Sequence, residues 1–200
     1  MFCLKGARMR ALTLGVITMW AIVALVAPTA RANLLNNGSF ETGDFSGWTM
    51  SANFNNTKVV PTSVGFGAQD GNFYVLFGSV FADSTLSQTS TDTPGGTLQV
   101  SGWLVGDGSS PSDWNMSING VTFVSVNPIP NQPYTEHTFT APATGLDTFV
   151  VGFRDDPAFG GMDNFVITEI PPAVPQPATL ALLGVALVGI SLASHLRKAR

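Results

Sequence analysis

The side chains that can do chemistry in this 200-residue chain are mainly carboxylates and aromatic rings. Between Asn33 and Ile170 there is one histidine, His137, and no cysteine, because the single cysteine is Cys3. One histidine cannot build a His-rich metal cluster, and no Gly-x-Ser-x-Gly segment occurs. Thirteen carboxylates allow many acid/base pairs, yet none is singled out, so a glycan-active hydrolase ranks behind the binding hypotheses. The residue types favour a non-enzymatic protein with no catalytic residues.

Aromatic rings on polar strand faces are the better candidates for a ligand site. In the strand predicted at Thr97–Val105, alternation places Trp103 on the polar face. An exposed indole offers a flat surface to sugar C–H groups, and neighbouring polar groups can orient hydroxyls. We therefore name Trp103, Tyr74 and Arg154 as candidates for a glycan-contacting face. The alternative is that the aromatic rings pack beneath a loop while Arg154 pairs with its neighbouring acids.

These side chains depend on a framework of short strands. Between Asn33 and Ile170, β-rich runs alternate with Gly, Asn, Asp and Pro breaks, without a long helical period. Strands are predicted at Asn72–Gly78, Thr97–Val105, Trp114–Ile118, Val121–Val126, Tyr134–Thr140, Thr148–Phe153 and Asp163–Ile170. Weaker candidates are Gly47–Ala52, Lys58–Pro61 and Ser84–Ser90. This spacing predicts an all-β domain, an antiparallel β-sandwich.

Two local signals refine the strand prediction. Asn119-Gly120 lies between two predicted strands and is a strong signal for a hairpin turn. Alternation assigns two sets of side chains to the core: Trp114, Met116 and Ile118 in one strand, and Phe149, Val151 and Phe153 in another.

The N-terminal segment has the three parts of a secretory signal peptide. Basic residues precede an apolar stretch, Ala11–Val26, and Ala30-Arg31-Ala32 supplies small residues for cleavage. Cleavage after Ala32 removes residues 1–32 as a signal peptide and leaves Asn33 as the first mature residue. The alternative, an N-terminal anchor, fits less well because the apolar run is short. We therefore expect an exported protein.

The C-terminal segment predicts a single membrane span. Val174, Pro175, Gln176 and Pro177 end a Pro-rich stalk at residues 171–177 and precede the uncharged run 178–196. At ~1.5 Å per residue, such a run just crosses a ~30 Å hydrocarbon core. The basic residues Arg197, Lys198 and Arg200 follow. We expect residues 197–200 to stay on the cytoplasmic side. The preceding domain then lies outside the cytoplasm.

The order of these parts resembles the PEP-CTERM sorting signal of Gram-negative bacteria, which has a Pro-Glu-Pro motif, an apolar span and a basic cluster. Here Gln176 stands where that family usually has Glu. The resemblance implies that exosortase, a membrane protease encoded beside exopolysaccharide genes, processes the tail. The alternative is a plain C-terminal anchor, which does not require the paired prolines.

The charge distribution limits the partners of the exported region. Between Asn33 and Ile170 the basic residues are Lys58 and Arg154, against all thirteen acidic residues, a net charge of −11. Such a surface repels nucleic acids and anionic lipid, so a nucleic-acid partner is not expected. It is compatible with divalent cations and neutral glycans, and equally with acidity that serves solubility alone.

The motif order from Asn33 on resembles the galactose-binding-like jelly roll of several carbohydrate-binding modules. The segment Asn33–Glu41 matches the start of such modules, and Gly161–Val166 matches their closing strand. The resemblance implies a structural Ca²⁺ shared by Glu41 and Asp163. The alternative is that Glu41 accepts hydrogen bonds in a turn while Asp163 simply begins a strand.

Together these features predict an exported, non-enzymatic protein, held at the inner membrane and then passed by exosortase to the cell surface or the extracellular polysaccharide matrix. A second hypothesis, compatible with the first, is a lectin-like module that binds neutral polysaccharide through Trp103.

Overall fold

The computed structural model describes residues 31–51 and 54–172, and its sandwich belongs to the second of two units of the chain, Asn33–Arg200. Ten strands occur in this part: β1 (Thr49–Met50), β2 (Lys58–Pro61), β3 (Phe73–Phe77), β4 (Ser84–Thr91), β5 (Thr97–Asp107), β6 (Ser112–Ile118), β7 (Val121–Val126), β8 (Asn131–Pro142), β9 (Leu146–Asp155) and β10 (Gly160–Ile170). Every strand expected from the sequence is present, the weaker candidates included. The all-β prediction is confirmed.

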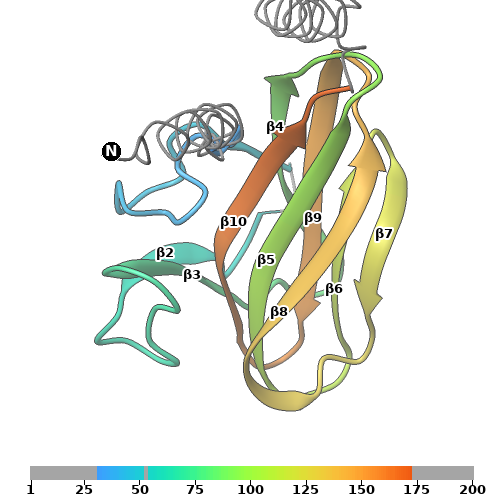
Figure 1. Ribbon diagram of the computed structural model, residues 1–200. Coiled ribbons are helices and arrows are strands. Elements are labelled where there is room, and N and C mark those ends of the chain that lie inside the picture. Colours follow the sequence, from blue (N-terminus) through green and yellow to red (C-terminus); the bar gives the residue numbers. More distant parts are fainter. Residues whose placement is uncertain (1–30, 52–53, 173–200) are drawn as a thin grey trace, which may run out of the picture. The chain divides into compact units, whose positions relative to one another are not determined.

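The strands form two antiparallel five-stranded sheets (Figure 1). Sheet A has the order β1-β4-β9-β6-β7, and sheet B has the order β2-β3-β10-β5-β8. From β3 on, the chain passes repeatedly between the sheets, and only the Asn119-Gly120 hairpin keeps consecutive strands, β6 and β7, together. This is the predicted antiparallel sandwich of jelly-roll type.

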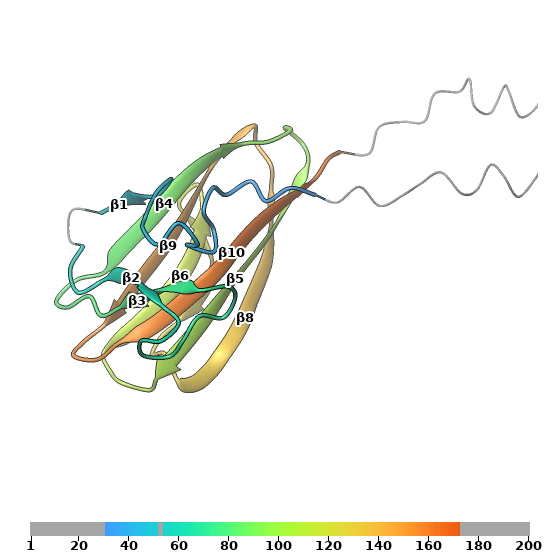
Figure 2. The same ribbon diagram turned by 90° about the vertical axis from the view of Figure 1, so that its left-hand side faces the viewer.

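The first and last segments of the sandwich run side by side at one end (Figure 2). The backbone N–H of Leu34 donates to the carbonyl of Ile167, and the Ile167 N–H donates to Oδ1 of Asn33. The chain therefore enters and leaves the domain at the same end, while the loops β3–β4, β5–β6 and β9–β10 lie at the opposite end.

Alternation along the strands builds one aromatic-rich core between the sheets. Both predicted core triplets are buried: Trp114, Met116 and Ile118 in β6, and Phe149, Val151 and Phe153 in β9. The Phe165 ring of β10 packs over Gly102 of β5, where any Cβ would collide with the ring. A glycine at this strand position is thus required by close packing.

Several strands are longer than predicted, and β10 is longer because glycine was taken as a break. β10 begins at Gly160 rather than Asp163, because Gly160 and Gly161 pair with Phe77 and Leu76 of β3. A side chain at Gly160 would collide with the Phe77 ring. The glycines here permit close strand pairing instead of ending the strand.

Candidate functional site

The outer face of sheet B carries a groove of about 490 Å³ that follows strands β10, β5 and β8. Its lining residues are Gln99, Val100 and Ser101 of β5, Glu136, Thr138, Phe139 and Thr140 of β8, and Val166 and Thr168 of β10. Most of them are polar side chains that alternation turns away from the core. The groove is therefore a polar, open surface on a rigid three-stranded platform.

Trp103 lies directly beyond this groove along β5. It continues the outward series of Gln99 and Ser101, and it is half-buried, whereas Leu104 beside it is fully buried. In the sheet it stands opposite Glu136 of β8 and Asp163 of β10. The predicted outward phase of Trp103 is confirmed. An indole, a carboxylate and several hydroxyls thus share one end of the groove.

Tyr74 does not belong to that open surface, which corrects the prediction that it shares a glycan-contacting face. Its side chain is fully buried on the outer face of sheet B, packed with Val60 and Leu76. Its hydroxyl donates to the carbonyl of Val64 (2.7 Å) and accepts from the N–H of Phe66 (3.0 Å). Burial raises the pKa of Tyr74. The loop of residues 62–72, the cover loop, seals this ring from solvent, as the alternative interpretation anticipated.

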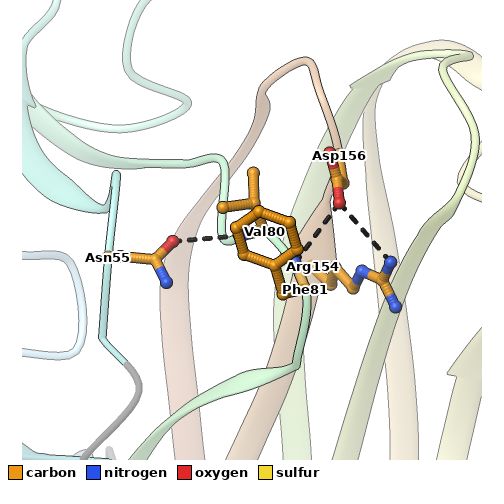
Figure 3. Close-up of polar contacts among 5 residues, drawn as sticks. All are labelled: Asn55, Val80, Phe81, Arg154 and Asp156. Atoms are coloured by element: carbon orange, nitrogen blue, oxygen red, sulfur yellow. Dashed lines mark hydrogen bonds and ion pairs between the residues drawn. The ribbon is translucent and has the colours of Figure 1, made fainter.

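Arg154 is also apart from Trp103, because it belongs to β9 of sheet A (Figure 1). Its Nη2 lies 3.5 Å from Oδ2 of Asp156, and the same oxygen accepts the N–H of Phe81 at 3.3 Å (Figure 3). Oδ1 of Asn55 accepts the neighbouring N–H of Val80 at 3.0 Å (Figure 3). Arg154 therefore pairs with its own acid and helps to hold the β3–β4 turn, instead of sharing a face with Trp103.

Glu41 and Asp163, the two predicted calcium ligands, hold opposite ends of one segment of the cover loop. Both carboxylate oxygens of Glu41 accept the N–H of Asn72 (2.9 and 3.0 Å), and Oε1 also accepts that of Phe73. Burial opposes ionisation of Glu41, but these N–H groups prevail and lower its pKa.

Asp163 is fully buried, with an equally complete set of donors. Its Oδ2 accepts the N–H groups of Gln69 (2.9 Å) and Asp70 (3.1 Å), and its Oδ1 accepts that of Asn164 (2.7 Å). Burial nevertheless raises the pKa of Asp163 to about 7, and the nearby charge of Glu41 contributes a smaller increase.

This donor set fits calcium poorly. N–H groups cannot ligate a cation, and they occupy the oxygens that the ion would need. Within residues 31–51 and 54–172, no three His, Cys, Asp or Glu side chains come together as a metal site. The geometry fits two carboxylates that pin a loop by hydrogen bonds, and calcium binding by Glu41 and Asp163 stays a prediction.

The polar side chains of β8 that line the groove were not among the predicted site residues. Glu136, Thr138 and Thr140 alternate along this strand, and in register they lie beside Trp103, Ser101 and Gln99 of β5. Strand alternation alone gives this signal, but not which strands are neighbours. His137, which lies between Glu136 and Thr138 in this strand, points inward. Its ring centroid is 5.2 Å from that of Trp114.

The predicted targeting segments lie outside the described residues. This applies to Ala30, to Val174, Pro175, Gln176 and Pro177, and to Arg197, Lys198 and Arg200. Ala32 is described and exposed. Over the described ranges, there is no helix with the length and apolar character needed to cross a bilayer.

Comparison with known proteins supports both the tail and the fold. Residues 173–198 match the PEP-CTERM protein-sorting motif. No curated protein sequence matches the chain.

Among solved structures, TmCBM61 in complex with β-1,4-galactotriose has a TM-score of 0.56 and 24% identity, over 68% of this chain and 97% of that one. The tailspike protein 4 domain of bacteriophage CBA120 has a TM-score of 0.52 and 14% identity, over 69% and 21%. A Clostridium thermocellum xylanase 10B fragment, with CBM22-1 and GH10 modules, has a TM-score of 0.50 and 14% identity, over 74% and 30%. The chain thus combines a PEP-CTERM sorting motif with a jelly-roll domain similar in fold to carbohydrate-binding modules.

Proposed function

We propose that this protein is an exported, non-enzymatic cell-surface or matrix protein, associated with exopolysaccharide or biofilm, whose sandwich binds neutral polysaccharide along the groove of sheet B. The observation that carries the binding proposal is the groove itself, with Trp103 at its end. An aromatic ring beside hydroxyls and a carboxylate can stack on a sugar while its hydroxyls are hydrogen-bonded.

The charge of the domain and the ligands of structures with a similar fold support a neutral glycan. The mature region has a net charge of −11, and Glu136 adds a negative charge inside the groove, so polyanions are repelled. TmCBM61, similar in fold, was solved with β-1,4-galactotriose, and the xylanase 10B fragment with xylohexaose. Both ligands are neutral oligosaccharides.

The lining of the groove supports binding without cleavage. Glycoside hydrolysis normally needs two carboxyl groups on either side of the scissile bond. Among the described residues that line the groove, Glu136 is the one carboxylate. We therefore rank hydrolysis below binding.

Delivery of the domain rests on the two ends of the chain. A signal peptide, residues 1–32, exports the protein, and the span at 178–196 holds it at the inner membrane as a single-pass protein with its N-terminus outside. An exosortase-type enzyme then processes the tail at the motif that matches residues 173–198. The chain leaves the domain at Ile170, which pairs with Thr97 of β5, so Trp103 lies farther from this exit than Gln99 does.

Polysaccharide pull-down of the full-length protein tests the binding proposal. Trp103→Ala should lower retention on neutral polysaccharide from the organism that makes the protein. The expected loss is at least tenfold, equivalent to about 1.4 kcal/mol of binding free energy. Phe81→Ala is the matched control, because this ring is 88% exposed and lies on the β3–β4 turn, away from the groove. Retention that survives Trp103→Ala intact would contradict the proposal.

Cell fractionation tests the delivery proposal separately. Removal of residues 174–200 should release the domain from the membrane fraction, because it deletes the apolar run and the basic end. Unchanged fractionation would contradict the anchor, whatever the pull-down shows.

A further inference from the structure

A carboxylate is buried without a hydrogen-bond donor at the end of the sandwich far from both chain ends. Asp155 is the last residue of β9, in phase with the inward side chains of Val151 and Phe153. It is 1% exposed, and neither of its side-chain oxygens has a hydrogen-bond partner. Alternation therefore sends a negatively charged group into the end of the core.

The surroundings of Asp155 add negative charge. Asp107, at the end of β5, and Asp156, the next residue, act on it, so that burial first and these two charges second raise the pKa of Asp155 to about 7. Of the two basic residues between Asn33 and Ile170, Arg154 points to the opposite face of β9 and pairs with Asp156. A buried carboxylate without donors is costly unless a proton or a cation neutralises it.

Two loops contact the backbone at this end of β9 through their carbonyl groups. The N–H of Asp155 donates to the carbonyl of Ser79 in the β3–β4 loop, at 3.3 Å. The N–H of Asp156 donates to the carbonyl of Pro111 in the β5–β6 loop, at 3.0 Å. Carboxylates combined with loop carbonyls and water are the ligands that Ca²⁺ prefers.

We propose that Asp155 and Asp107, with backbone carbonyls of the β3–β4 and β5–β6 loops, bind a divalent cation of the calcium class. Because no three acidic or histidine side chains converge within the described ranges, carbonyls and water complete the coordination. This site differs from the predicted pair Glu41 and Asp163, whose oxygens accept N–H groups of the cover loop, because both oxygens of Asp155 lack a partner. Asp107 accepts the N–H of Ser109 through Oδ1 alone. The cation neutralises the end of the core and ties the β3–β4 and β5–β6 loops to the end of β9.

Thermal unfolding of the purified full-length protein in detergent tests this site. After treatment with EDTA, Ca²⁺ at about ten times its Kd, roughly 1–10 mM for an extracellular module, should raise Tm by about 3–5 °C at pH 7.5. Asp155→Asn should abolish this rise. Without Ca²⁺, it should leave Tm equal to or above the wild-type value, because it removes a buried unpaired charge.

Asp163→Asn is the matched control, since Asp163 is also fully buried and also has a pKa raised to about 7. The proposal expects Asp163→Asn to keep the Ca²⁺-dependent rise. If Ca²⁺ leaves the Tm of the wild-type protein unchanged, the proposal is overturned. A rise that persists in Asp155→Asn but disappears in Asp163→Asn also overturns it, and assigns the ion to the Glu41 and Asp163 pair.

Native mass spectrometry with Asp107→Asn keeps the test decisive if Asp155→Asn does not fold. Asp107 is exposed, so its replacement should spare the fold. The wild-type protein should retain one Ca²⁺ per domain, and Asp107→Asn should weaken that binding about tenfold through loss of one charged ligand. Equal ion occupancy in both proteins would count against the site.

Discussion

The outer face of sheet B has two halves that differ in access. Over β2 and β3, the cover loop seals Tyr74, and its Gly67 carbonyl also accepts the hydroxyl of Tyr134. Over β10, β5 and β8, the same kind of outward-facing positions form an open groove that ends at Trp103. Strand alternation is alike in both halves. Access is decided by whether a loop, pinned from distant strands, lies above the sheet.

Removing the ring under the cover loop should have the largest effect. Tyr74→Ala should reduce the free energy of unfolding by about 3–5 kcal/mol, because it empties a fully buried aromatic site. Tyr74→Phe should cost less, about 1–3 kcal/mol, since only the partners at Val64 and Phe66 are lost. Urea unfolding measures both. A cost below about 1 kcal/mol for Tyr74→Ala would show that the ring is not sealed.

The buried carboxyl group of Asp163, which holds the cover loop by hydrogen bonds, should make the free energy of unfolding depend on pH. Its pKa is raised to about 7 in the folded protein, so the folded state binds more protons than the unfolded chain above pH ~4. The contribution of Asp163 to the free energy of unfolding is fully present below pH ~4. It is lost, on the order of 2–4 kcal/mol, as pH rises through 7. Without Ca²⁺, the raised pKa values of Asp155 (about 7) and of Asp113 in β6 (about 6) act in the same direction.

Urea unfolding at several values between pH 4 and pH 8 checks this dependence. Asp163→Asn should reduce the slope of the free energy of unfolding against pH. The part of the slope that comes from Asp155 and Asp113 should remain. An unchanged slope in Asp163→Asn would mean that this carboxyl is ionised throughout.

Loss of the hydrogen bonds that Glu41 accepts should have the smallest effect on the free energy of unfolding, because this carboxylate is exposed. Glu41→Gln should cost about 0.5–1.5 kcal/mol and speed hydrogen exchange at the N–H groups of Asn72 and Phe73. Since the pKa of Glu41 is lowered, its contribution is present above the unfolded pKa and is lost as pH falls through the folded pKa. Glu136→Gln, in the groove, is the control that should leave these amides unchanged.

The sequence predicted what local alternation controls. It placed every strand, the outward phase of Trp103 and the inward phase of Trp114, because period two is a property of each strand alone. It misplaced Tyr74, because the cover loop is held by contacts such as that between Gln69 and Asp163, 94 residues apart. It misplaced Arg154 because phase gives the face of a strand but not the sheet that the strand joins.

Hydroxyl-radical footprinting of the full-length protein, with and without neutral polysaccharide from the organism that makes it, is a direct test of binding along the groove of sheet B. Polysaccharide bound along the groove should lower oxidation of Trp103. It should leave unchanged the oxidation of the exposed rings of Phe66, on the cover loop, and Phe81, on the β3–β4 turn. Protection of Phe66 or Phe81 with Trp103 unaffected would contradict binding along the groove of sheet B.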